Sequence, residues 1–180
     1  EDLIQREDMV VTVTNAGYVK RVPLSTYRAQ RRGGKGRSGM ATRDEDFVSQ
    51  VFVASTHTPL LLFSSFGRVY MLKVYRLPQG TPQSRGKAFQ NLLRLADGGF
   101  VTTVMPLPED EESWGDLTVV FATARGMVRR NSLNDFTRLN ALGKYAMKFD
   151  ENDTGERLVG VATCTEDDDI LLASRDGKCI

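Results

Sequence analysis

The sequence contains very few of the residues that build metal sites and disulfide frameworks. It has two cysteines, Cys164 and Cys179, and one histidine, His57, among 180 residues. Two cysteines are too few for a disulfide framework, and without clustered histidines they do not predict a zinc site. We therefore expect no bound metal, and we expect both cysteines to be reduced residues of the core or of strands.

Long apolar runs are also absent. The longest runs, such as Leu60–Phe63 and Val119–Ala122, are far below the length that spans a membrane. Glu1 and Asp2 do not resemble the start of a signal peptide. A composition of 41% hydrophobic and 26% charged residues is typical of one ordinary folded domain. These features predict a cytoplasmic protein without a membrane partner.

The residue patterns of catalysis are missing as well. His57 lies between two threonines in a predicted turn, where a structural role is expected. No nucleophile elbow occurs, and the acidic runs Glu109–Glu112 and Asp167–Asp169 lack the ligand spacing of a calcium loop. We expect neither catalytic residues nor a cofactor site within this chain.

Acidic residues are absent from one long stretch of the first half. The window from Met9 to Arg43 holds eight basic residues and no acidic one. From Met9 to Ala96 there are 14 basic and 3 acidic residues, whereas from Asp97 to Ile180 there are 9 basic and 16 acidic residues. The formal net charge of +1 therefore hides a basic first half, which favours a polyanionic partner.

The most basic and glycine-rich segment runs from Gln30 to Arg37. It combines four cations with three glycines, whose missing side chains favour close approach of a bulky polyanion. We predict that these residues bind a phosphate backbone: Gln30, Arg31, Arg32, Gly33, Gly34, Lys35, Gly36 and Arg37. The alternative is a basic loop that is only solvated surface.

Two nucleotide-binding motifs do not explain this segment. Gly34–Gly39 satisfies the G-x-G-x-x-G pattern, but it lacks the preceding apolar strand, the following helix and the acidic residue about twenty positions further on. A P-loop would require a glycine at Ala29 and a hydroxyl residue at Gly36.

An internal repeat organises the chain. Four segments consist of an apolar run, a few small or polar residues, a glycine and a second strand-like run, and their marker glycines are Gly17, Gly67, Gly126 and Gly177. A basic glycine turn follows the first three markers, as Gly34-Lys35, Gly86-Lys87 and Gly143-Lys144. The longer spacing between the second and third markers is explained by an acidic insertion around residues 108–116, which is predicted to be a surface loop carrying Trp114.

The repeat predicts an all-β fold of propeller type. Each unit of roughly 50 residues accommodates about four short strands, for example near Phe47–Ala54, Leu60–Ser64, Arg68–Val74 and Ala88–Leu93. A glycine at each marker supplies the positive φ of a tight hairpin. Residues 1–180 are thus expected to form three complete units and the opening hairpin of a fourth, as part of one domain.

The repeat also predicts a basic track. Basic residues recur in the second strand of each hairpin and at the glycine turns, so stacked units would align them along a rim. The rim residues predicted to bind DNA are Lys20, Arg21, Arg68, Lys73, Arg85, Lys87, Arg129, Arg130 and Lys144.

Gln30–Gly36 closely resembles the box motif of the C-terminal DNA-wrapping domain of bacterial DNA gyrase A. The resemblance extends through Tyr27–Ala29, Ala54–His57, Gly67–Tyr70 and Lys73–Tyr75. It implies a β-pinwheel of about six blades, of which about three and a half are present, with strands exchanged between neighbouring blades. We refer to Gln30–Gly36 as the box.

The same resemblance implies a function. The domain would bind double-stranded DNA around its basic rim with little sequence preference and impose a chiral wrap, which presents a DNA segment for negative supercoiling by a type II topoisomerase. The implied partners are the remainder of gyrase A and the gyrase B protein in a heterotetramer, and ATP and Mg²⁺ are implied for the whole enzyme. Two alternatives stay open: the equivalent domain of topoisomerase IV, whose box is usually degenerate, and a propeller that binds proteins.

Overall fold

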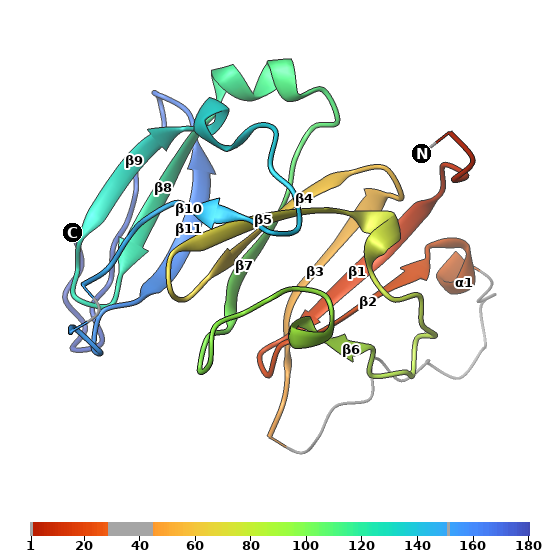
Figure 1. Cartoon of the computed structure of the whole chain (residues 1–180), viewed down its shortest axis with the longest axis horizontal. Helices are drawn as coiled ribbons and strands as arrows, with labels where there is room; N and C mark the ends of the chain where they lie inside the picture. The colour runs from red at the N-terminus through yellow and green to blue at the C-terminus, as the bar shows by residue number, and fades with distance from the viewer. Residues whose placement is uncertain (1, 29–44, 151) are drawn as a thin grey trace.

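The computed structural model describes residues 2–28, 45–150 and 152–180 (Figure 1). Within these ranges the regular secondary structure is mostly strand, with only short helices between the strands. The strands are β1 (Asp8–Thr14), β2 (Tyr18–Pro23), β3 (Val48–Ser55), β4 (Pro59–Ser64), β5 (Arg68–Lys73), β6 (Lys87–Ala88), β7 (Val101–Pro106), β8 (Thr118–Thr123), β9 (Val128–Ser132), β10 (Lys144–Tyr145) and β11 (Leu158–Cys164). The helices are α1 (Ser25–Arg28) and the 3-10 helices η1 (Val74–Arg76), η2 (Phe89–Asn91), η3 (Glu111–Asp116) and η4 (Leu133–Phe136).

The four marker glycines each close a hairpin turn in the same way. Gly17, Gly67, Gly126 and Gly177 have φ values of 89°, 82°, 85° and 80°. Each donates its N–H, at 3.0 Å, to the carbonyl oxygen three residues earlier. A positive φ favours glycine, because residues with a side chain rarely adopt this backbone conformation. The four marker glycines thus share one turn geometry, and the fourth hairpin contains a bridge between Ala173 and Cys179.

The strands of one sequence repeat do not all join one sheet. The three sheets have the orders β3-β1-β2-β6, β10-β5-β4-β7 and β11-β8-β9 within the described residues. Strand β6 follows the second hairpin in sequence but pairs with β2 of the first, and β10 follows the third hairpin but pairs with β5 of the second. The strand exchange that the family resemblance implied is thus present at both described junctions.

The sheets meet along the edge formed by β3, β7 and β11, which we call the inner edge. The side-chain amide of Gln50 on β3 donates to the carbonyl of Val104 on β7 and accepts from its N–H, both at 2.9 Å. Between β7 and β11, Thr102 Oγ1 donates to the carbonyl of Leu158 at 3.1 Å. The exchanged strands β6 and β10 lie at the opposite, outer edge of their sheets.

The middle sheet is buried on both faces. Successive side chains of a strand point to opposite faces, and β4 is apolar at four consecutive positions. Leu60 and Leu62 enter a core shared with the first sheet, whereas Leu61 and Phe63 enter a core shared with the third. All four are fully buried. A continuous apolar run is therefore what a strand between two packed neighbours requires.

Two local predictions need correction. The region near residues 88–93 is strand only at β6 and then turns into η2, because Phe89 is directed into the first core. The acidic insertion is not a simple surface loop either. It contains η3, capped by the side chain of Asp110, and Trp114 is fully buried in the second core with its Nε1 donating to the carbonyl of Pro108 at 2.9 Å.

The two cysteines are both free. Cys164 ends β11 and is half-buried. Cys179 is exposed and pairs with Ala173 in the bridge of the fourth hairpin. Both therefore lie at strand positions, and neither belongs to the two apolar cores.

Two kinds of structure are absent from the described residues. Among them, no helix combines the length and apolar character that a membrane crossing requires. In the same ranges, no group of three or more histidine, cysteine or acidic side chains is arranged to hold a metal.

Candidate nucleic-acid interface

The box and Arg37 lie outside the described residues, which resume with the segment leading into β3. The prediction that they bind a phosphate backbone therefore stays a prediction. In the register of the sequence repeat, Gly34-Lys35 is the counterpart of Gly86-Lys87 and Gly143-Lys144. The two described counterparts belong to the exchanged segments at the outer edge.

The described Gly-Lys turns show why the two residue types occur together. Gly86 and Gly143 have φ values of 84° and 71°. A Cβ on Gly86 would lie 2.3 Å from the carbonyl oxygen of Val19, and one on Gly143 would lie 2.5 Å from that of Val69. These glycines thus allow the exchanged strand to approach the neighbouring sheet. For the basic segment Gln30–Arg37, in contrast, we explained the glycines by the close approach of a polyanion.

The lysines of these turns remain at the surface. Lys87 on β6 and Lys144 on β10 are both exposed. Lys144 also donates to the carbonyl of Asp135 and lies 5.3 Å from the ring centroid of Phe136. Each exchanged strand therefore carries one cation on the outer edge, as the predicted track requires, and the contact of either lysine with DNA stays a prediction.

The rim prediction for Lys20 is wrong. The residue is 1% exposed, and its Nζ donates 2.8 Å hydrogen bonds to the carbonyl oxygens of Thr81, Pro82 and Ser84. An ammonium group has three donors, so none remains for a phosphate. Burial lowers the pKa of Lys20, while the three carbonyl acceptors favour the charged form. Lys20 instead fixes the turn that leads into β6.

Replacing Lys20 with alanine is expected to lower the free energy of unfolding by about 3 kcal/mol, because three carbonyls lose a charged donor and a cavity forms beside β2. Urea denaturation measures the change. Lys87→Ala is the matched control, since replacing an exposed lysine is expected to change the free energy of unfolding by less than about 0.5 kcal/mol. Equal stabilities of the two variants would show that the three-carbonyl cage contributes nothing.

Two predicted DNA-binding arginines also join neighbouring repeats. Arg21 Nε donates to the carbonyl of Leu77 at 2.9 Å. Arg68 Nε and Nη2 donate to the carbonyl of Leu142 at 3.1 and 2.9 Å, and its guanidinium carbon lies 5.2 Å from the ring centroid of Tyr145. Burial lowers the pKa of Arg21, and this effect is partly opposed by the nearby carboxylate of Glu7. Part of each guanidinium is thus committed to the fold.

The third repeat offers less free positive charge. Arg129 donates to the carbonyl of Ala146 and to Asn131 Oδ1. Arg130 is largely exposed, but it lies 3.7 Å from the carboxylate of Glu166, which is itself exposed. Acidic neighbours therefore reduce the local potential at β9, in agreement with the acidic composition of the second half.

The remaining rim residues lie in the second repeat. Arg85 stacks over the ring of Tyr18, with 3.5 Å between the guanidinium carbon and the ring centroid. Lys73, at the end of β5, lines a groove together with Arg76, Asn91 and Asn140. Arg76 belongs to the basic first half but is not among the predicted rim residues, and no motif marks the two asparagines. Two cations and two amides in one groove form a suitable surface for a phosphate backbone.

Comparisons with known proteins agree with this architecture. The family model described as "DNA gyrase C-terminal domain, beta-propeller" matches residues 8–55, 58–108 and 118–165. The three matched segments correspond to β1–β3, β4–β7 and β8–β11.

Curated relatives match along the whole chain. The chain is 54% identical over 180 residues to the DNA gyrase A protein of Rickettsia bellii (strain RML369-C) and 45% identical to that of Escherichia coli (strain K12). Both matches cover 100% of this chain, which spans 20% of the length of each relative.

Solved structures show the same fold. The crystal structure of the C-terminal domain of DNA topoisomerase IV has a TM-score of 0.73 and 25% identity, over 89% of this chain and 47% of that one. The structure of the DNA gyrase A C-terminal domain has a TM-score of 0.65 and 23% identity, over 96% of this chain and 53% of that one. The predicted all-β pinwheel architecture is confirmed.

Proposed function

Because the chain belongs to the family of DNA gyrase C-terminal domains, we propose that it binds double-stranded DNA along the outer edges of its sheets and wraps it. The observation that carries the proposal is the recurrence of a basic turn on both exchanged segments that the structure describes. Lys87 and Lys144 are exposed there, and the box is their counterpart in the first repeat.

Electrostatics supply the driving force for this wrap. Bending 20 to 30 base pairs by 40 to 90° costs roughly 1–6 kcal/mol. Several such segments must be offset by many phosphate contacts and the counterions that they release. The 14 basic residues between Met9 and Ala96 remain numerous enough for this role after Lys20 is excluded. Base-specific readout is not expected, because the described residues contain neither a recognition helix nor a zinc module.

In the proposed mechanism, this chain determines the path of the DNA, and the rest of the enzyme carries out the reaction. A chiral wrap would place a neighbouring segment of the same DNA at the double-strand break, which gives negative supercoiling its direction. The partners would be the remainder of gyrase A and the gyrase B protein in a heterotetramer in the cytoplasm. ATP and Mg²⁺ would be bound by parts of that enzyme outside this chain, as the family resemblance implies.

Two other functions are less well supported. The topoisomerase IV domain shares the fold, but the intact box and the 54% identity to a DNA gyrase A protein favour gyrase. A protein-binding propeller would use the acidic second half, which does not explain the exposed lysines at the exchanged strands.

Wrapping is tested by closing nicked circular DNA with ligase in the presence of the chain and then measuring the linking number after the protein is removed. We expect a shift that grows with the ratio of protein to DNA, because a chiral wrap is trapped as a change in linking number. Binding without a shift would contradict wrapping, and the absence of binding would favour the protein-binding alternative. Introduction of negative supercoils by the enzyme joined to this chain would favour gyrase over topoisomerase IV.

A further inference from the structure

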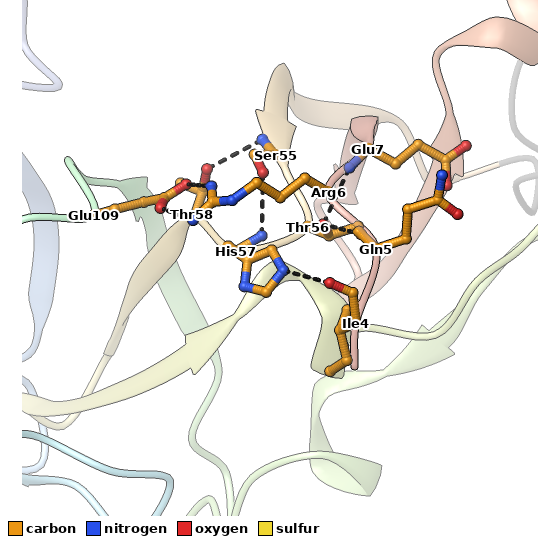
Figure 2. Close-up of polar contacts among 9 residues, drawn as sticks. All are labelled: Ile4, Gln5, Arg6, Glu7, Ser55, Thr56, His57, Thr58 and Glu109. Atoms are coloured by element: carbon orange, nitrogen blue, oxygen red, sulfur yellow. Dashed lines mark hydrogen bonds and ion pairs between the residues drawn. The ribbon is translucent and has the colours of Figure 1, made fainter. Parts of the chain in front are cut away.

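The segment that precedes β1 is fastened to the body of the domain rather than left as a free tether. Residues 4–7 run alongside the β3–β4 turn, Ser55–Thr58 (Figure 2). We call residues 4–7 the strap. Leu3, immediately before the strap, is fully exposed.

Thr56 binds the backbone of the strap at two residues. Its N–H donates to the carbonyl of Glu7 at 2.9 Å, and its Oγ1 accepts from the N–H of Glu7 at 3.3 Å. The same hydroxyl donates to the carbonyl of Gln5 at 2.8 Å. Thr56 is only 3% exposed, so these contacts are shielded from competing water.

His57 holds the next residue of the strap. Its Nε2 lies 2.8 Å from the carbonyl oxygen of Ile4, a distance at which the protonated nitrogen donates a hydrogen bond. The imidazole ring packs edge-on against Tyr75, with 5.9 Å between ring centroids. A ring fixed on one side by an aromatic neighbour directs its nitrogen to the strap.

A third contact ties the strap to a distant part of the chain. Arg6 Nη1 and Nη2 donate to the two carboxylate oxygens of Glu109 at 2.7 and 2.8 Å (Figure 2). This bidentate geometry is specific in direction. The hydrogen bond from Arg6 holds the pKa of Glu109 below its usual range. Glu109 follows β7 of the second sheet. The strap is therefore attached both to the turn that follows β3 of the first sheet and to the segment that follows β7.

From these contacts we propose that the strap fixes the path of the polypeptide that leads into the domain, and thereby narrows the range of orientations that the outer edges take relative to the rest of the gyrase A protein. If the chain were attached only at β1, it would pivot at Asp8, as flexible linkers do. The strap moves the pivot upstream of Ile4. The inference rests on the proposed wrapping function, because orientation matters only if the outer edges carry DNA.

The test uses a gyrase A protein with this chain as its C-terminal domain, and fluorophores on the domain and on the rest of the protein. The double variant Thr56→Val with His57→Phe removes the hydroxyl and the imidazole nitrogen but keeps similar shapes. Thr58→Val is the matched control, because Thr58 Oγ1 accepts from the N–H of Ser55 in the same turn and does not bind the strap.

Arg6→Ala is a second variant, at an exposed side chain of the strap. Its control is Arg125→Ala, which breaks the exposed ion pair with Asp153.

We expect the double variant and Arg6→Ala to broaden the distribution of fluorophore distances, and both controls to leave it narrow. The double variant should slow supercoiling about tenfold, because displacement far from the chemistry misplaces the DNA. The DNA affinity of the 180-residue chain should stay within about twofold, because these substitutions remove no exposed cation from the outer edge.

An unchanged distance distribution in both strap variants would overturn the proposal. Broadening by Thr58→Val to the same degree would also overturn it, since the turn and not the strap would then be responsible. If the double variant fails to fold, Arg6→Ala decides the outcome. Failure of the unmodified chain to bind DNA would refute the proposed function, whereas the distance distributions would still report on the strap.

Discussion

Replacing Arg31, Arg32 and Lys35 with alanine is expected to abolish or strongly reduce negative supercoiling by the enzyme that contains this chain. These cations belong to the densest positive segment of the sequence, where no acidic residue occurs between Met9 and Arg43. A wrap needs a point that holds DNA against its elastic recoil, and we predict that the box provides it. The measurement is the rate of supercoiling of relaxed circular DNA.

The same variant should separate wrapping from folding and from cleavage. The box has no apolar side chain, so the free energy of unfolding should change by no more than about 0.5 kcal/mol. Relaxation and DNA cleavage should persist, because no catalytic residue is expected in this chain. A triple variant in the acidic half, with Arg157, Arg175 and Lys178 changed to alanine, removes the same charge from exposed positions and serves as the control. Supercoiling at the unmodified rate by the box variant would mean that the box is only a solvated loop.

DNA binding is expected to weaken steeply with salt. If the chain neutralises at least five phosphates, affinity should fall by about 500-fold between about 50 and about 200 mM salt, because the slope of log K against log salt is near −0.9 per phosphate. Titration of a labelled duplex at several salt concentrations measures the slope. Duplexes of unrelated sequence serve as controls and should bind with similar affinity. A flat salt response, or strong preference for one short sequence, would contradict electrostatic wrapping.

The sequence predicted the repeat well because its signal is a backbone requirement. A hairpin closed at positive φ favours glycine, so Gly17, Gly67, Gly126 and Gly177 mark each unit whatever surrounds them. The apolar run Leu60–Phe63 in β4 was equally informative, since a strand between two packed neighbours favours apolar side chains on both faces. The family resemblance added the exchange of strands, which periodicity alone does not specify.

The sequence could not distinguish a surface cation from one that is used inside the fold. Lys20 belongs to the same basic half as Lys87, but only the three-dimensional arrangement brings the carbonyls of residues 81–84 around its ammonium group. Trp114 was misjudged for a similar reason. Its acidic neighbours indicate solvent, while the indole is large enough to fill the second core from a short helix at the surface. Charge patterns describe surroundings along the chain, whereas burial depends on contacts between distant residues.

Strand exchange also sets a mechanical property of the molecule. Turning of one sheet relative to the next would strain the pairing of β2 with β6 or of β5 with β10, and the hydrogen bonds of Lys20 and Arg68 to carbonyls of the exchanged segments oppose the same motion. Neighbouring sheets are therefore coupled at the outer edge as well as through their shared cores. A body with this stiffness imposes its own curvature on a flexible partner, so the bend would be stored as elastic energy in the DNA while the protein keeps its shape.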